Sequence, residues 1–213
     1  MTRARKLIVF DFGNVLIDLH YQSHFEAFRA LFGKQWPAPE YPFLISETIK
    51  KYETGQISDE AFIWQFQQLS DAPPPREIVN AWLVLLGDIH AERLVMLQYL
   101  KAHYQVAMLS NINALHLHHI RRYLQQEHDV SDFEERFFDK VFYSHELGLR
   151  KPEEEIYMYL EEAMGFKGKD ILFIDDRWDN VETAQRRSWH AIRHKPGTEI
   201  TENINAYLRQ AEF

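Results

Sequence analysis

Residues 6–20 read KLIVFDFGNVLIDLH, and this stretch decides the fold. A continuous apolar run from Leu7 to Phe10 ends at one acid, Asp11, and Gly13 stands two positions further on. An apolar run without polar alternation predicts a strand that is buried on both faces of a parallel sheet. Because ligands bind beyond the carboxyl ends of such strands, we expect the Asp11 carboxylate to lie in a functional site.

Further apolar segments follow in the second part of the chain, and helical patterns separate them. The predicted strands lie at residues 104–110, 140–144, 170–176 and 190–194. Strands that alternate with helices indicate a parallel sheet with right-handed crossovers. We therefore expect an α/β fold with a Rossmann-like, doubly wound parallel sheet as its core.

The stretch between residues 20 and 86 has a different pattern, because it carries helical signals alone. Phe25, Phe28 and Phe32 recur at helical spacing. Ser58 precedes a pair of acids, which is typical of a helix start. This stretch is expected to be entirely helical.

The position of the helical stretch predicts the domain organisation. It follows the first strand directly and contains a proline-rich connector at residues 34–42. We expect a helical cap of residues 20–86, inserted into a Rossmann-like catalytic core of residues 1–19 and 87–213. Such an insertion would cover the carboxyl edge of the sheet, where the site is expected.

The composition excludes several classes of protein. The chain has 213 residues with 46% hydrophobic content, enough for one substantial core with a small inserted domain. A formal charge of −8 disfavours a general binder of nucleic acid or anionic membranes. The absence of cysteine excludes disulfides, thiolate catalysis and cysteine-based zinc sites. No apolar run is long enough for a bilayer, so a cytoplasmic protein is expected, and the sequence does not indicate its oligomeric state.

Polar residues cluster where the predicted strands stop. They are Asp11, Ser110, Asn111, Lys151, Asp175 and Asp176. In a parallel sheet these strand ends lie along one edge, so residues distant in sequence should converge. Two or three carboxylates can hold a hard cation such as Mg²⁺, and one carboxylate can act as a nucleophile. A lysine and a hydroxyl can bind phosphoryl oxygens and stabilise their charge.

Each of these residues also has a structural explanation when taken alone. Ser110 and Asn111 fit an ordinary helix N-cap, and Lys151 fits a solvated loop. A histidine cluster, His116, His118 and His119, suggests metal binding, but we predict that these side chains lie on the solvated face of a helix. The prediction of a functional site therefore depends on all of these polar residues occurring together at the strand ends.

Four motifs occur in order and carry a resemblance to a known family. They are FDFGNVL (10–16), LSNIN (109–113), GLRKPEEEIY (148–157) and FIDDRWDNVETA (173–184). The chain resembles the haloacid dehalogenase-like hydrolase superfamily over nearly its whole length, including a helical cap after the first motif. It is most similar to a bacterial D-x-G-N-V subgroup, which includes an α-D-glucose-1-phosphate phosphatase.

The resemblance implies a Mg²⁺-dependent phosphatase that acts through an aspartyl-phosphate. Asp11 would be the nucleophile and a Mg²⁺ ligand, and Gly13 would offer its backbone carbonyl to the metal. Asp176 would bind Mg²⁺ directly, and Asp175 would act directly or through water. The implied substrate is a small phosphorylated metabolite, such as a sugar phosphate.

The same resemblance assigns the phosphate-binding residues. Ser110 would hold a phosphoryl oxygen, with the Asn111 backbone or amide assisting. Lys151 would pair with both the nucleophile and the phosphoryl group. Asn180 would order the loop after the fourth strand.

Gly13 departs from the commonest phosphatases of the superfamily, which carry an acid two residues after the nucleophile. That acid protonates the leaving alcohol, and general acid–base help of this kind contributes about 10²–10⁴-fold. We hypothesise that a nearby group replaces it, with Asp18, His20 and His24 as candidates. Two alternatives remain open: a metal-independent 2-haloacid dehalogenase, and a non-catalytic protein that binds phosphate ligands at a degenerate site.

Overall fold

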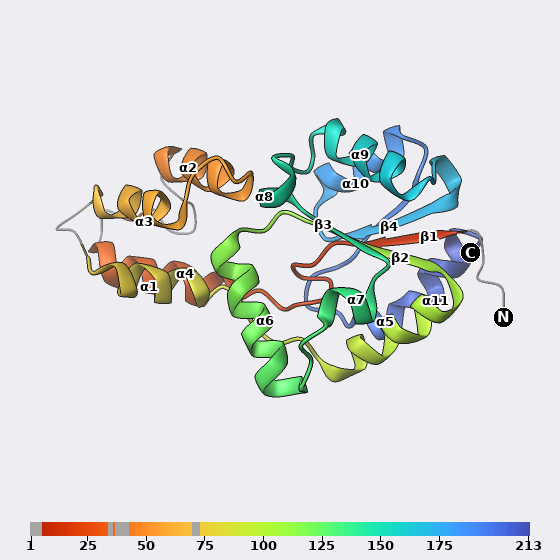
Figure 1. Ribbon diagram of the computed structural model, residues 1–213, viewed down its shortest axis with the longest axis horizontal. Coiled ribbons are helices and arrows are strands. Elements are labelled where there is room, and N and C mark those ends of the chain that lie inside the picture. The colour runs from red at the N-terminus through yellow and green to blue at the C-terminus, as the bar shows by residue number, and fades with distance from the viewer. Residues whose placement is uncertain (1–5, 34–35, 37–42, 70–72) are drawn as a thin grey trace.

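A computed structural model describes residues 6–33, 36, 43–69 and 73–213, and a parallel sheet lies at its centre (Figure 1). Its strands are β1 (Leu7–Phe10), β2 (Gln105–Ser110), β3 (Lys140–Tyr143), β4 (Ile171–Asp175) and β5 (His190–Arg193). They lie in the order β3-β2-β1-β4-β5, and every neighbouring pair is parallel. The predicted α/β fold is confirmed, and the strand that precedes Asp11 is the central one.

Helices cover both faces of the sheet (Figure 1). One face packs against α5 (Ala91–His103), α6 (Ala114–His128), α7 (Phe133–Phe137) and α11 (Ile200–Gln210). The other packs against α9 (Glu154–Met164) and α10 (Trp178–Arg186). Side chains of β1 alternate between these two hydrophobic clusters, since Ile8 and Phe10 join the first and Leu7 and Val9 the second. Burial on both faces explains why β1 is continuously apolar.

Four helices pack around a hydrophobic cluster of their own. They are α1 (Tyr21–Phe32), α2 (Phe43–Glu53), α3 (Asp59–Gln67) and α4 (Pro75–Leu83). Aromatic rings dominate this cluster: Phe28 stacks against Trp36 at 4.8 Å and against Phe66 at 5.1 Å between centroids. As predicted, Ser58 caps α3, and its hydroxyl accepts a hydrogen bond from the backbone N–H of Ala61.

The four helices lie at the end of the molecule opposite the C-terminus (Figure 1). Leu19 forms an isolated antiparallel bridge with Leu86, and the N–H of Gly87 donates to the carbonyl of Asp18 at 2.8 Å. The two segments that connect the four helices to the sheet are thus hydrogen-bonded to each other, close to the expected domain boundary. The division into a 20–86 cap and a surrounding core stays a prediction, and the proline-rich connector lies largely outside the described residues.

The structure adds short elements that the sequence did not predict. They are α7, α8 (Ser144–Leu147) and a 3₁₀ turn at Gly168–Asp170. Ser144, expected as the last residue of a strand, instead begins α8. None of the described helices has the length and apolar character needed to cross a bilayer.

Candidate active site

The side chains predicted to converge meet at the carboxyl edge of the sheet. Asp11 follows β1, Asp175 ends β4, and Lys151 lies in the loop before α9. The Lys151 ammonium donates to Asp11 Oδ1 at 2.7 Å and to Asp175 Oδ2 at 2.6 Å. All three side chains are at most 10% exposed, so a buried cation joins two buried carboxylates.

Asp175 has hydrogen-bond partners on both carboxylate oxygens. Besides Lys151, the backbone N–H of Arg177 donates to its Oδ1 at 2.8 Å. The Asn180 amide donates to both oxygens at 3.0 Å. These contacts hold Asp175 firmly and order the loop after β4, and they leave it little capacity to bind a metal ion directly.

Asp176 is held less tightly than Asp175. It is only partly buried, and Asn14 is its side-chain donor. The Asn14 amide donates to Asp176 Oδ2 at 2.8 Å, which connects the turn after β1 to the turn after β4. Asn14 adopts a left-handed backbone conformation, with φ at 55°. An asparagine tolerates this conformation better than most residues do.

The charges of this cluster do not balance. Asp11, Asp175 and Asp176 can each place a carboxylate oxygen within 4.8 Å of the others, while Lys151 brings one positive charge. Burial and then repulsion by Asp175 raise the pKa of Asp11 to about 7, although Lys151 lowers it. Burial likewise raises the pKa of Asp176. Burial alone would lower the pKa of Lys151, but attraction to Asp11 and Asp175 outweighs burial and raises it.

The donor set fits a divalent cation. Oxygen ligands at close range are what Mg²⁺ prefers, and a bound cation would relieve the excess negative charge. Asp11 and Asp176 line the acidic cavity and can offer carboxylate oxygens, whereas the oxygens of Asp175 already accept hydrogen bonds from Lys151, Asn180 and the Arg177 backbone. The buried Asn180 Oδ1 has no hydrogen-bond partner among the described residues, so it is suited to accept from a metal-held water.

Ser110 and Asn111 reach the same edge but differ in their contacts. Asn111 exchanges two hydrogen bonds of 2.9 Å with the backbone of Lys151, so its amide positions that lysine. Ser110 is 3% exposed and lines a cavity near the cluster. It is Asn113 that caps α6, since its side chain accepts from the backbone N–H of His116.

Two adjoining cavities surround these residues. The smaller, here called the acidic cavity, has a volume of about 130 Å³ and is lined by Asp11, Lys151, Asp176 and Asn180 among others. The larger, here called the large chamber, has a volume of about 400 Å³ and lies between the sheet edge and the four-helix unit. Both are lined by Gly13, Leu19, Tyr21, Glu53, Asn111, Arg150 and Arg177.

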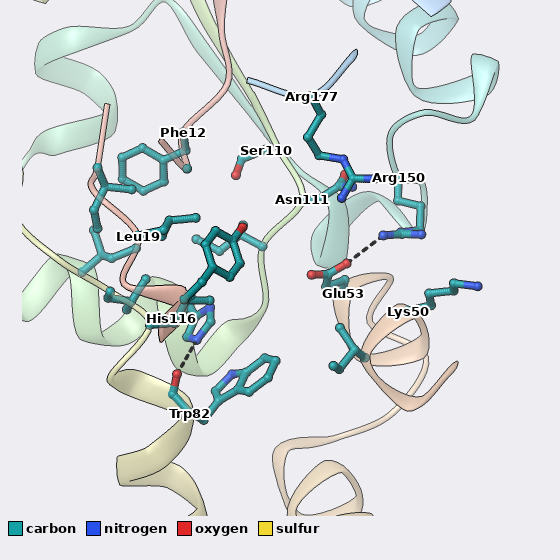
Figure 2. A pocket seen from close by; sticks show the side chains of 18 of the residues that line it. Phe12, Leu19, Lys50, Glu53, Trp82, Ser110, Asn111, His116, Arg150 and Arg177 are labelled. Carbon is teal, nitrogen blue, oxygen red and sulfur yellow. Dashed lines mark hydrogen bonds and ion pairs between the residues drawn. The ribbon is translucent and has the colours of Figure 1, made fainter. Parts of the chain in front are cut away.

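Charged side chains lie where the two cavities meet (Figure 2). Arg150 Nη2 donates to Glu53 Oε2 at 3.0 Å, which links the loop before Lys151 to the end of α2. Burial raises the pKa of Glu53, and the arginine opposes this shift. Arg177 is the third charged group shared by both cavities.

The structure places the proposed substitutes for the missing acid outside both cavity linings. Asp18 binds Arg93 at 2.8 Å and His90 at 3.2 Å, on another part of the surface. His20 is exposed. His24 is buried among the aromatic rings of the four-helix unit, where burial lowers its pKa to about 4. Those three hypotheses are therefore not supported by the geometry.

Gly13 is closely covered by an apolar side chain. A Cβ atom at this position would lie 2.8 Å from Leu19 Cδ1, so Leu19 occupies the space that the first atoms of an acidic side chain need. Because Leu19 Cδ1 is the end of a flexible side chain, a small shift of Leu19 would admit a Cβ here, so packing alone does not account for the missing acid.

One prediction about the histidines was wrong. His116 is buried, and its ring stacks on Trp82 with centroids 4.9 Å apart. Burial lowers the pKa of His116 to about 3. His118, in contrast, is exposed as expected. His116 is covered because Trp82 of α4 packs against this part of α6.

Several site residues had not been singled out from the sequence. Asn14 binds Asp176, and the others line the cavities: Tyr21, Glu53, Trp82, Arg150 and Arg177. Arg150 and Arg177 directly adjoin Lys151 and Asp176, so nearness to a motif was an available signal. Glu53 and Trp82 carried no comparable signal, because their roles depend on how the four-helix unit packs onto the sheet edge.

Comparison with known proteins gives a consistent assignment. The family model of haloacid dehalogenase-like hydrolases matches residues 5–186. The D-ribitol-5-phosphate phosphatase of Bacteroides thetaiotaomicron is 23% identical over 206 residues, covering 95% of this chain and 98% of the relative. A sesquiterpene phosphatase of Aspergillus oryzae is 29% identical over 144 residues, covering 66% and 68%.

Solved structures support the same fold. A haloacid dehalogenase family enzyme from Bacteroides thetaiotaomicron superposes with a TM-score of 0.83 at 26% identity, covering 93% of this chain and 98% of the other. The wild-type form of that enzyme, in complex with magnesium and inorganic phosphate, gives a TM-score of 0.76 at 27% identity, covering 91% and 96%.

Proposed function

The chain belongs to the haloacid dehalogenase-like hydrolase family, and from this premise we propose that it is a Mg²⁺-dependent phosphatase of small phosphate monoesters. The observation that carries the proposal is Lys151, whose ammonium bridges Asp11 and Asp175 inside a cluster of three acids. This arrangement holds a carboxylate nucleophile beside groups suited to a metal ion and to phosphoryl oxygens.

The residues have distinct roles in the proposed reaction. Asp11, Asp176 and the Gly13 carbonyl would hold Mg²⁺, and Asp175 would support the site directly or through water. When bound, Mg²⁺ supplies positive charge that offsets the charge of the carboxylates and of the phosphoryl oxygens. Lys151 orients Asp11 and donates to the phosphoryl group.

The reaction then proceeds in two displacements. An Asp11 carboxylate oxygen attacks phosphorus, the bond from phosphorus to the ester oxygen breaks, and the alcohol leaves with a proton from solvent. Water attacks the same phosphorus and loses a proton to solvent, the bond to Asp11 breaks, and inorganic phosphate is released. Ser110 accommodates a phosphoryl oxygen in both steps, while Asn111 keeps the Lys151 backbone in place.

The names of the relatives leave the organic group of the substrate open. One relative is named for a polyol phosphate and another for a sesquiterpene phosphate. The sugar-phosphate substrate that the sequence suggested, glucose 1-phosphate included, stays a prediction.

Phosphate release from a panel of monoesters, measured with Mg²⁺ and again with EDTA, tests the proposal. We expect EDTA-sensitive release that disappears in the Asp11→Asn variant. Chloride release from 2-haloacids without metal would instead identify a dehalogenase. Inactivity across the panel, together with tight phosphate binding, would identify a binding protein.

A further inference from the structure

The large chamber has two chemically different ends (Figure 2). At one end lie the polar groups next to the acidic cavity: Ser110, Asn111, Arg150, Arg177 and Glu53. The rest of the lining is mostly aliphatic or aromatic: Phe12, Ile17, Leu19, Ile49, Trp82, Leu85, Leu86, Ile112 and Ile120. A phosphate group seated by the polar end would therefore direct its organic part along an apolar wall.

Polar atoms on the apolar side are already used within the protein. The two ring nitrogens of His116 lie 3.2 Å from the Trp82 carbonyl and 3.2 Å from the Asn113 amide. The Trp82 indole N–H donates to Asn113 Oδ1 at 3.4 Å. Lys50, at the rim, binds Glu47 at 2.6 Å.

Few groups remain to receive the hydroxyls of a polyol. Away from Ser110, the lining residues that carry a hydroxyl are Ser46 and Tyr21, and Tyr21 also lines the acidic cavity. A sugar or polyol brings several hydroxyl groups, and each one buried without a partner weakens binding by about 5- to 150-fold. An apolar group loses nothing at such a wall and gains from leaving water.

We propose, building on the phosphatase function above, that the large chamber binds the apolar organic group of a phosphate monoester, such as an alkyl, isoprenyl or aryl chain. Its volume of about 400 Å³ lies within the range of small-molecule sites. Leu19, Ile49, Leu85 and Leu86 are only partly buried, so they form the accessible surface of this wall.

The test compares phosphate esters of primary alcohols, which differ little as leaving groups. The substrates are n-alkyl phosphates from propyl to octyl, D-ribitol 5-phosphate and glucose 6-phosphate, with acetyl phosphate as a probe without a large organic group. Each buried methylene should raise kcat/KM by about two- to fourfold until the chamber is filled. The inference would be overturned if kcat/KM did not rise along the alkyl series, or if polyol phosphates had a higher kcat/KM than alkyl phosphates of equal size.

Binding measurements separate this inference from the phosphatase assignment. Calorimetry with n-alkyl phosphonates, which cannot be hydrolysed, should show the same two- to fourfold gain in affinity per methylene. If this gain appears without hydrolysis of any ester, acetyl phosphate included, the phosphatase proposal fails and the apolar site stands. If hydrolysis occurs but the gain is absent, the apolar site fails alone.

Variants locate the effect in the chamber. Ile49→Asn and Leu85→Asn should each lower the ratio of octyl phosphate to acetyl phosphate activity by about tenfold, because each places a polar group in the wall. Val95→Asn is the matched control, since Val95 is 65% exposed on α5 and lines neither cavity. An unchanged ratio in both chamber variants, with folding confirmed by circular dichroism, would overturn the assignment of this wall.

Discussion

The acidic cavity and the large chamber adjoin each other but are built in different ways. The acidic cavity is made mainly of short loops at strand ends, and its side chains are held by direct hydrogen bonds. Lys151, for example, donates from its ammonium to Asp11 and Asp175 and from its backbone N–H to Asn111. The large chamber lies between two packing units, and its wall consists mainly of apolar side chains from both.

This difference implies that the acidic cavity determines catalysis, whereas the chamber determines substrate preference. The acidic cavity depends on charges placed to within tenths of an ångström, so single substitutions there should abolish activity. The chamber depends on the area and polarity of its wall, so substitutions there should change substrate preference by moderate factors. The following predictions probe this contrast, beginning with the largest effect.

Asp11→Asn removes the proposed nucleophile and should lower kcat by about 10⁴-fold or more. The thermal stability of the variant, in contrast, should increase at alkaline pH. Because the pKa of Asp11 is raised to about 7 in the folded state, its ionisation costs folded-state stability as pH rises from about 4 to 7. At pH 8 without metal, the variant should therefore melt at a higher temperature than the wild type. A lower melting temperature would contradict the charge imbalance described for this cavity.

Lys151→Met should damage both activity and stability. It leaves Asp11 and Asp175 buried without their cation, which should destabilise the fold by about 3–5 kcal/mol. Urea unfolding measures this loss, and added Mg²⁺ should recover part of it. Lys50→Met is the control, since Lys50 is exposed and pairs with Glu47, and its removal should cost less than about 0.5 kcal/mol.

The acidic cavity was largely predictable from the sequence, whereas the chamber was not. Continuous apolar runs give buried strands, and parallel order brings their polar ends together, so Asp11, Lys151 and Asp175 followed from local patterns. His116 was assigned to a solvated face because the pattern of α6 alone does not reveal that Trp82 covers it. Glu53 likewise depends on packing between elements distant in sequence. Helices as short as α7 and α8 span too few residues for a periodic signal.

Asn14→Gly probes how the turn after β1 supports Asp176. Glycine keeps the left-handed backbone at φ 55° but removes the amide that donates to Asp176. Loss of such a supporting contact typically weakens metal binding by about 10–100-fold. Calorimetric titration with Mg²⁺ should show this weakening. Ser188→Gly is a matched control, because Ser188 also has a positive φ, 64°, but lies away from the metal-binding residues.

Acid should destabilise the four-helix unit through His24. Its folded pKa of about 4 lies below the unfolded value of 6.5, so the unfolded chain binds the extra proton. The stability that depends on neutral His24 is complete above pH 6.5 and falls as pH drops towards 4. At pH 5 the loss should be about 2 kcal/mol. His24→Gln should remove this part of the pH dependence, and an identical pH profile in wild type and variant would refute it.

Glu53→Gln tests the contact where the two regions meet. The pair with Arg150 is less than a quarter exposed, so removing its charge should loosen the four-helix unit from the sheet edge and lower kcat/KM by about 3–10-fold. Glu47→Gln is the control, because Glu47 lies on the same helix and its exposed pair with Lys50 should contribute little.

Comparing substrates with different leaving groups shows whether Glu53 holds the four-helix unit against the sheet edge or donates a proton to the leaving alcohol. Burial raises the pKa of Glu53, but its carboxylate accepts a hydrogen bond from Arg150. If this contact is structural, the variant should lose the same factor with an aryl phosphate as with an alkyl phosphate. A much larger loss with the alkyl ester, whose alkoxide needs a proton, would instead make Glu53 the acid that Gly13 lacks. The four-helix unit would then supply a catalytic group as well as the chamber wall, and the separation of chemistry from selectivity would no longer hold.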